Sequence, residues 1–285
     1  MYSGTGPQAG YQPTFPSGGQ GVQIGGTYPS PTMPDFQPIP SSLRNDYDHS
    51  VRPSVGLDET REVFEFKNSN FRVRFIRKVY TLLSVLLIVT ALGVLATHLN
   101  PPIRKFFRAN RWVVIVASVV SILFMYAITC FRSLARKVPL NYFLLFGFGA
   151  CQSLVVAHVA SFYNSETVLI AAGLTAAVVL TITIFACVTK TDLGFLWPFV
   201  TVFAVVFAIV SLVGIFVRGK VMTLVVAGMS TLLFSVYLLL HTQLIVGKNE
   251  RGYDMDDYVI ATLEIYTDIV QLFLSILRIV GALKD

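Results

Sequence analysis

From Val79 onward, the chain alternates long apolar runs with short polar breaks. The hydrocarbon core of a bilayer needs about 20 predominantly apolar residues for one helical span. The clear runs of this kind are, in chain order, 79–99, 112–131, 140–158, 168–188, 193–217 and 221–246. The pattern therefore predicts six membrane-spanning helices, joined by loops that are too short to hold a separate domain.

A seventh apolar run, residues 258–280, contains the acidic residues Glu264 and Asp268. Each acid costs roughly 2.5 to 3.5 kcal/mol at a helix centre, and thirteen Leu, Ile, Val and Phe residues each contribute roughly 0.3 to 0.6 kcal/mol in the other direction. The favourable and unfavourable free energies of membrane insertion about cancel for this run alone, so it needs partner helices. Its polar residues are Glu264, Asp268, Gln271, Ser275 and Arg278, which are spaced 4, 3, 4 and 3 positions apart. This spacing places them on an arc of about 80° on one helix face.

Such a narrow polar stripe predicts a helix inside a bundle, with the stripe turned inward. The alternative is an amphipathic helix on the membrane surface, which would favour a polar face rich in Lys and Arg rather than an acidic one. We therefore expect an all-α, polytopic membrane protein whose residues 67–285 form a seven-transmembrane-helix bundle.

The first 66 residues differ from the rest of the chain. Residues 1–40 hold eight Pro and eight Gly among Tyr, Gln, Ser and Thr, too few apolar side chains to offset the entropy of ordering. We expect residues 1–66 to be a disordered tail without a cleavable signal peptide. Two PxxP patterns, 13–16 and 31–34, fit a minimal adaptor ligand, although Pro-rich tails also produce this pattern by chance.

Composition and charge agree with a membrane protein. Hydrophobic residues make up 54% and charged residues 13%, against about 45–50% and about 25% in ordinary soluble domains. The net charge is +6, but the basic residues form short clusters beside the apolar runs, which favours lipid headgroups over nucleic acid as the partner. The three cysteines lie in or beside apolar runs, and their spacing fits neither a disulfide framework nor a metal site.

Lys and Arg residues beside the spans also predict an orientation. With seven spans, eleven fall on the side of the tail and eight on the other, which favours a cytosolic N terminus. The four basic residues between 104 and 111 lie on the less basic side and oppose this assignment.

Ionisable groups inside a membrane are expensive and are therefore candidates for function. Asp268 lies deep in the seventh run, where its nearest charged neighbour, Glu264, has the same sign, so its partner must come from another helix. In the sixth run, His241 shares a helix face with Tyr237, four residues earlier. A lone histidine on an apolar helix is more often structural than functional, so spacing leaves both roles open for His241.

Four short motifs, in order along the chain, carry a resemblance to a known family. Residues 266–277, from Tyr266 through Asp268 to Leu277, resemble the last-helix signature of the transmembrane Bax inhibitor motif family. Residues 136–139, 161–166 and 241–244 resemble its lifeguard branch, which includes the glutamate-receptor-associated members. The resemblance covers roughly residues 70–283, and the tail resembles that branch in composition.

The resemblance implies a seven-helix fold in endoplasmic reticulum or Golgi membranes, a pH-sensitive calcium leak and suppression of stress-induced cell death. It implies no enzymatic activity and no cofactor, with calcium as the transported ion and with cell-death regulators and adaptor proteins as further partners. Relatives use two aspartates on the sixth and seventh helices as a proton-holding pair that gates the ion path, helped by an arginine after the second helix.

In this chain the seventh-helix aspartate of the family matches Asp268, whereas His241 stands where the sixth-helix aspartate is expected. Arg136 is the nearest match for the arginine, with Arg132 one turn earlier as a rival. Glu166 matches a family position at a helix start, where the helix dipole alone favours a carboxylate.

We expect His241 and Asp268 to face one another and to sense protons in place of two carboxylates. Two close carboxylates keep one proton and a net charge of about −1, whereas a histidine and an aspartate attract each other and stay near zero until the histidine loses its proton. This pair should therefore hold calcium more weakly than the carboxylate pair of the relatives.

Three other functions compete with an ion leak. A non-conducting adaptor could recruit partners through the Pro-rich tail. An intramembrane aspartyl protease needs two facing aspartates, and His241 removes one of them. A seven-helix ligand receptor is disfavoured by the short loops.

Overall fold

The computed structural model of the chain describes residues 55–131, 136–189, 191–217, 219–246, 253–254 and 256–284, with side chains from residue 72 onward. These residues are helical apart from short connections. The elements in chain order are α1 (Val55–Leu99), α2 (Pro101–Ala109), α3 (Arg111–Cys130), α5 (Leu140–Ala160), α6 (Ser165–Val188), the short 3₁₀ helix η2 (Gly194–Leu196), α7 (Trp197–Phe216), α8 (Lys220–Val246) and α9 (Tyr258–Lys284).

Seven of these helices are long and apolar enough to cross a membrane. The membrane-crossing part of α1 is Arg72–Leu99, the fifth span includes η2 as Gly194–Phe216, and the other five spans coincide with α3, α5, α6, α8 and α9. The predicted all-α, seven-helix class is therefore confirmed, and the chain is a multi-pass integral membrane protein whose immediate partner is the lipid bilayer.

The first helix starts earlier than the apolar pattern suggests. The basic stretch before Val79 continues the same helix, since Arg and Lys are good helix formers, and Phe75 within it is buried in the core. The backbone of α1 begins at Val55, ahead of the boundary that we expect at residue 66. The expected disorder of residues 1–54 lies outside the described residues.

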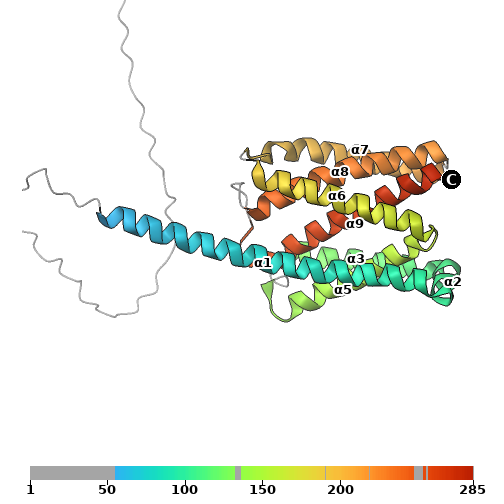
Figure 1. Cartoon of the computed structure of the whole chain (residues 1–285), viewed down its shortest axis with the longest axis horizontal. Coiled ribbons are helices and arrows are strands. Elements are labelled where there is room, and N and C mark those ends of the chain that lie inside the picture. Colours follow the sequence, from blue (N-terminus) through green and yellow to red (C-terminus); the bar gives the residue numbers. More distant parts are fainter. Residues whose placement is uncertain are drawn as a thin grey trace, which may run out of the picture. The chain divides into compact units, whose positions relative to one another are not determined.

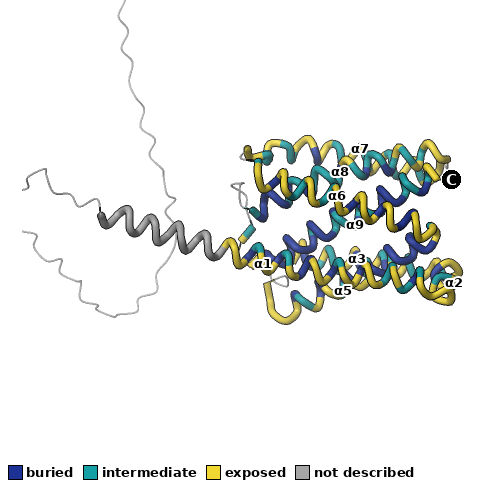
Figure 2. The backbone as a smooth tube through the Cα atoms, in the orientation of Figure 1, coloured by how far each residue is buried: buried dark blue, intermediate teal, exposed yellow. Residues whose placement is uncertain are grey.

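Helix α9 occupies the centre of the bundle. It packs against α8, α6, α1 and α5, and Figure 1 shows it crossing between the α6–α8 pair and the α1–α5 pair. It is also the most deeply buried of the seven spans, as the dark tube in Figure 2 shows. The prediction that residues 258–280 form a bundle helix rather than a surface helix is thus confirmed.

The polar stripe of α9 points into the protein, as its spacing predicts. Asp268 and Ser275 are buried, and Glu264, Gln271 and Arg278 are half-buried. Most apolar side chains on the other faces of α9 are buried, and this packing offsets the cost of the polar groups.

Helix α2 has no counterpart among the predicted elements. Pro101 and Pro102, which the apolar pattern reads as a stop, form the first turn of this helix, where a missing N–H costs nothing. The α2 residues Arg104 and Arg108 donate hydrogen bonds to the carbonyl oxygen of Ser161, at the C-terminal end of α5, and Arg104 also donates to that of Tyr163. The bonds to Ser161 satisfy a carbonyl group that the end of α5 leaves free, and the bond to Tyr163 holds the turn before α6.

Candidate functional site

The centre of the site is a contact between α8 and α9. The Nδ1 atom of His241 lies 2.6 Å from the Oδ2 atom of Asp268, and the two side chains are 12% and 4% exposed. Asp268 lies about 15 Å beyond the start of α9, at about 1.5 Å per residue. The structure therefore brings together the two residues that we expect to face one another, inside the membrane-spanning region.

A second carboxylate flanks the same imidazole. Glu264 lies one turn before Asp268 on α9, and its Oε2 atom is 3.7 Å from the Nε2 atom of His241. The His241 ring is thus placed between two acids, one on each nitrogen. A protonated imidazole carries an N–H on both nitrogens, so this arrangement matches imidazolium with two carboxylates.

Aromatic rings fix the imidazole from the side of α7 and α8. The Tyr237 ring lies parallel to His241, with 5.7 Å between ring centroids and 9° between ring planes. Trp197, the first residue of α7, places its ring 5.6 Å from that of His241. Contact between rings at these distances is stabilising, so Tyr237 and Trp197 hold the imidazole toward α9.

Tyr253 covers Glu264 on the side of the membrane surface. Its hydroxyl donates a hydrogen bond to the Oε2 atom of Glu264, and its ring stacks on Phe75 of α1 at 6.3 Å. Burial, followed by the charge of Glu264, raises the pKa of Tyr253 well above its usual range. Tyr253 therefore stays a neutral hydrogen-bond donor at physiological pH.

Arg136 binds the segment that carries Tyr253. Its guanidinium lies 2.8 Å from Asp254 and 2.9 Å from Asp257, and it donates to both carboxylates. The hydrogen bonds that Arg136 donates to Asp257, followed by those to Asp254, raise the pKa of Arg136 above its usual value. Arg136, the nearest match for the family arginine, thus pairs with acids that precede α9.

A second polar cluster lies where α1, α5 and α9 meet, around Tyr258, which follows Asp257 directly in sequence. The buried amide of Asn141 donates a hydrogen bond of 2.6 Å to the Tyr258 hydroxyl, and the Lys78 ammonium lies 3.2 Å from the centroid of the Tyr258 ring. A cation over an aromatic face is attracted by the ring. These contacts hold the first turn of α9 against α1 and α5.

Taken in order from the surface, the polar contacts form a line into the membrane. The line begins at Arg136 with Asp254 and Asp257, continues through Tyr253 and Glu264, and ends at His241 and Asp268. Among the residues that the structure describes, no three His, Cys, Asp or Glu side chains gather into a metal site. The arrangement can hold a proton and present acidic oxygens to a cation.

One expected site residue, Glu166, lies elsewhere. Glu166, in the first turn of α6, is exposed and forms a 2.8 Å ion pair with Lys284 at the end of α9. At about 1.5 Å per residue, Lys284 lies about 24 Å along α9 from Asp268, so Glu166 belongs to the other end of the bundle. Arg132 lies outside the described residues.

Sequence reasoning missed Trp197, Tyr253, Asp254 and Asp257. The acids form an Asp-x-Asp-Asp run just before α9, opposite the basic stretch that ends in Arg136 and Lys137, and this complementary charge is a signal that could have found them. Trp197 and Tyr253 carry no such signal, because their roles depend on the packing of α7 on α8 and of the 253–257 segment on α1.

Comparison with known proteins agrees with these observations. The family described as "Inhibitor of apoptosis-promoting Bax1" matches residues 72–285. Protein lifeguard 3 of Mus musculus is 30% identical to this chain, covering 99% of the chain and 94% of the relative. Protein lifeguard 3 of Homo sapiens is 28% identical over the same shares. The Golgi anti-apoptotic protein of Vaccinia virus (strain Lister) is 29% identical, covering 74% of the chain and 86% of the viral protein.

The family match covers the entire membrane domain, and the mouse relative aligns over nearly the full length of both proteins. The shared segment contains all seven spans and both His241 and Asp268. The chain therefore belongs to the Bax inhibitor family of multi-pass membrane proteins, which are not enzymes, and its relatives include proteins of the lifeguard type.

Proposed function

We propose that this protein is a pH-sensitive calcium leak that opens when His241 of the His241–Asp268 pair loses its proton. The observation that carries the proposal is the 2.6 Å contact between these two side chains, which come from different helices and lie within the membrane spans. Ionisable groups in that position are costly and are characteristic of ion and proton pathways.

The sign of the pH response follows from the charges. With His241 protonated, its positive charge neutralises Asp268 and ties α8 to α9. When His241 loses its proton, Asp268 and Glu264 are left with a net charge of about −2 and the ion pair is lost. A divalent cation is then attracted and the two helices are less firmly held, so calcium flux should rise as pH rises.

The side chains near the surface support entry from the side of the α8–α9 connection. Arg136 fixes the segment that carries Tyr253, and Tyr253 covers Glu264. In this proposal, movement of that segment exposes Glu264 first and the His241–Asp268 pair second. The line of contacts thus supplies both a cover and a cation pathway.

We further propose that the leak lowers the calcium load of an intracellular store and thereby suppresses stress-induced cell death. The names of the relatives support this role, since one is a Golgi anti-apoptotic protein and the family is described as an inhibitor of the apoptosis-promoting Bax1. We propose an endoplasmic reticulum or Golgi location with a cytosolic N terminus. Protease added to intact organelles should then remove residues 1–54, and protection of this segment would reverse the orientation.

A non-conducting adaptor that recruits cell-death regulators through its Pro-rich tail is the alternative. Deleting residues 1–54 distinguishes the two functions, because this deletion leaves every described helix in place. A leak predicts that the truncated protein still releases calcium from loaded vesicles and still protects stressed cells. Loss of protection in a truncated protein with no calcium release at either length would favour the adaptor.

A further inference from the structure

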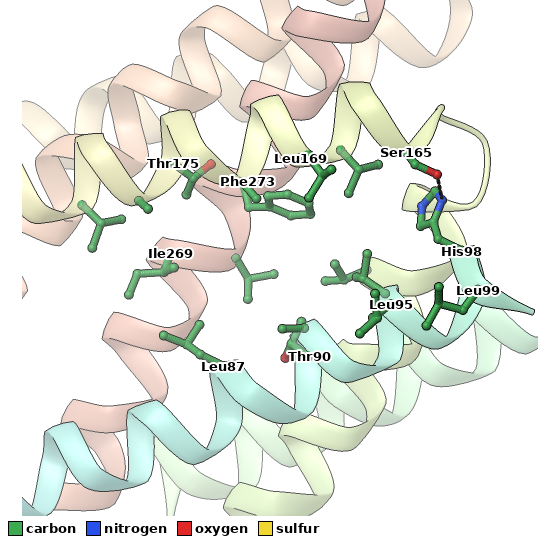
Figure 3. A pocket seen from close by; sticks show the side chains of 18 of the residues that line it. Leu87, Thr90, Leu95, His98, Leu99, Ser165, Leu169, Thr175, Ile269 and Phe273 are labelled. Atoms are coloured by element: carbon green, nitrogen blue, oxygen red, sulfur yellow. Dashed lines mark hydrogen bonds between the residues drawn. The ribbon is translucent and has the colours of Figure 1, made fainter.

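An apolar groove of about 750 Å³ lies between α1 and α6. Its walls come from α1 and α6, and Ile269, Val270 and Phe273 of α9 form its floor. Figure 3 shows Leu87 and Thr90 on one wall, Thr175 and Leu169 on the other, and the α9 side chains between them. Because these segments belong to membrane spans, the medium around the groove is lipid.

The groove is polar at one end. There His98, at the end of α1, places its Nδ1 atom 3.1 Å from the hydroxyl of Ser165, the first residue of α6 (Figure 3). The end of one span and the start of another lie at the membrane surface. The polar end therefore lies at the depth of lipid headgroups.

Deeper in the groove, the hydroxyl groups already have partners. The Thr90 hydroxyl donates to the carbonyl oxygen of Leu86 and lies 2.7 Å from the Tyr266 hydroxyl, and the Thr175 hydroxyl donates to the carbonyl oxygen of Ala171. The rest of the lining consists of Leu, Val, Ala, Ile and Phe side chains. A ligand with one polar end and an apolar remainder fits this distribution.

The length of the groove matches the apolar part of a lipid. On α1 the lining runs from Leu87 to Leu99, about 18 Å at about 1.5 Å per residue. One leaflet contributes about half of the roughly 30 Å hydrocarbon core. We propose that the groove binds one acyl chain of a glycerophospholipid, with the headgroup beside His98 and Ser165 and the chain end near Leu87.

Such a chain would complete the packing of α9. Ile269 and Phe273 line the groove and are only half-buried, and Ile269 follows Asp268 directly in sequence. An occupied groove seals the flank of the helix that carries Asp268. The site is separate from the His241–Asp268 contact, so it stands whether or not the protein conducts calcium.

Photolabelling of the full chain in vesicles tests the proposal. The probes are two phosphatidylcholines, one with a diazirine close to the headgroup and one with a diazirine near the methyl end of an acyl chain. The first should label peptides around His98 and Ser165, and the second should label those around Leu87 and Val179. Equal labelling of the groove and of lipid-facing residues on α7, with no difference between the probes, would overturn the proposal.

Two neighbouring alanines of α6 provide a matched pair of variants. Both are exposed, but Ala176 lines the groove and Ala177 does not. Ala176→Trp fills the groove and should reduce labelling by the methyl-end probe several-fold, whereas Ala177→Trp should leave it unchanged. Equal labelling of the two variants would contradict the proposal.

Ala172→Leu provides a smaller filling of the same groove if Ala176→Trp lowers the melting temperature. It should also reduce labelling by the methyl-end probe while the protein stays folded.

Competition with unlabelled lipid distinguishes a phospholipid site from a sterol site. If a low proportion of cholesterol displaces the methyl-end probe and unlabelled phosphatidylcholine does not, the groove is a sterol site and the proposal is overturned.

Discussion

The substitution His241→Asp changes the charge of the site while leaving its position on α8 unchanged. Opposite unit charges 2.6 Å apart interact by about 6 kcal/mol at an effective dielectric constant of about 20. In the variant, that attraction becomes a repulsion of similar size, so the two carboxylates share one proton near neutral pH. With Glu264 included, the net charge changes from about −1, with imidazolium present, to about −2.

The extra negative charge should increase calcium occupancy. Even with the dielectric constant of bulk water, one unit charge about 5 Å from a divalent cation contributes about 1.7 kcal/mol, and about 1.4 kcal/mol corresponds to a factor of ten. At calcium concentrations low enough for flux to follow occupancy, we expect His241→Asp to raise the flux about tenfold. The loss of the ion pair between α8 and α9 acts in the same direction.

The assay is calcium efflux from vesicles that hold equal amounts of wild-type or variant protein, read with a calcium dye outside. His49→Asp is the matched control, because it makes the same exchange in a histidine of the N-terminal tail, before the first of the seven spans. The control should leave the flux near the wild-type value. If folded His241→Asp protein has an unchanged flux and an unchanged pH profile, His241 is a structural histidine and the charge argument is wrong.

Asp268→Asn keeps the shape of the side chain but removes its charge, so calcium efflux should fall several-fold while the bundle stays folded; a poorly expressed, unfolded variant without specific flux loss would show a purely structural role. Arg136→Gln frees the segment that carries Tyr253, so we expect a higher flux at a given pH, and an unchanged flux would show that Arg136 does not hold the entrance closed. Gly281→Ala should cost about 1–3 kcal/mol of stability, because an added Cβ meets the Tyr163 ring, whereas Gly228→Ala, whose Cβ meets no described atom within 4 Å, should be neutral or stabilising in a thermal melt.

The seven spans were predictable because a membrane helix must satisfy its backbone internally and face lipid with apolar side chains, which leaves a long apolar run in the sequence. The orientation of the 258–280 helix was predictable as well, because the spacing of its polar residues alone indicates that Asp268 points inward. The apolar pattern fails at α2, where prolines that end one helix begin the next. Arg104 and Arg108 of that helix act on carbonyl groups more than fifty residues away, which no local pattern encodes.

The candidate site was likewise only partly predictable from the sequence. Burial cost singles out Asp268 and His241 from the sequence, and helical spacing adds Tyr237 on the face of His241. The partners of Arg136 could not be assigned in this way, because Asp254 and Asp257 lie in a connection with no periodicity. Trp197 reaches the imidazole only through the packing of α7 on α8. The free-energy cost of burying an ionisable group thus identifies these residues from the sequence, whereas tertiary packing decides which residues they contact.

The most direct test of the central claim is the pH profile of calcium efflux, measured side by side for wild-type protein and His241→Gln in otherwise identical vesicles. The glutamine keeps a polar side chain on α8 but cannot carry a charge. We predict that wild-type efflux rises as pH increases through the range in which a histidine loses its proton, and that the His241→Gln profile is flat over that range and lies near the wild-type maximum. Wild-type efflux equal to that of protein-free vesicles at every pH, or an identical pH response in the variant, would contradict the account.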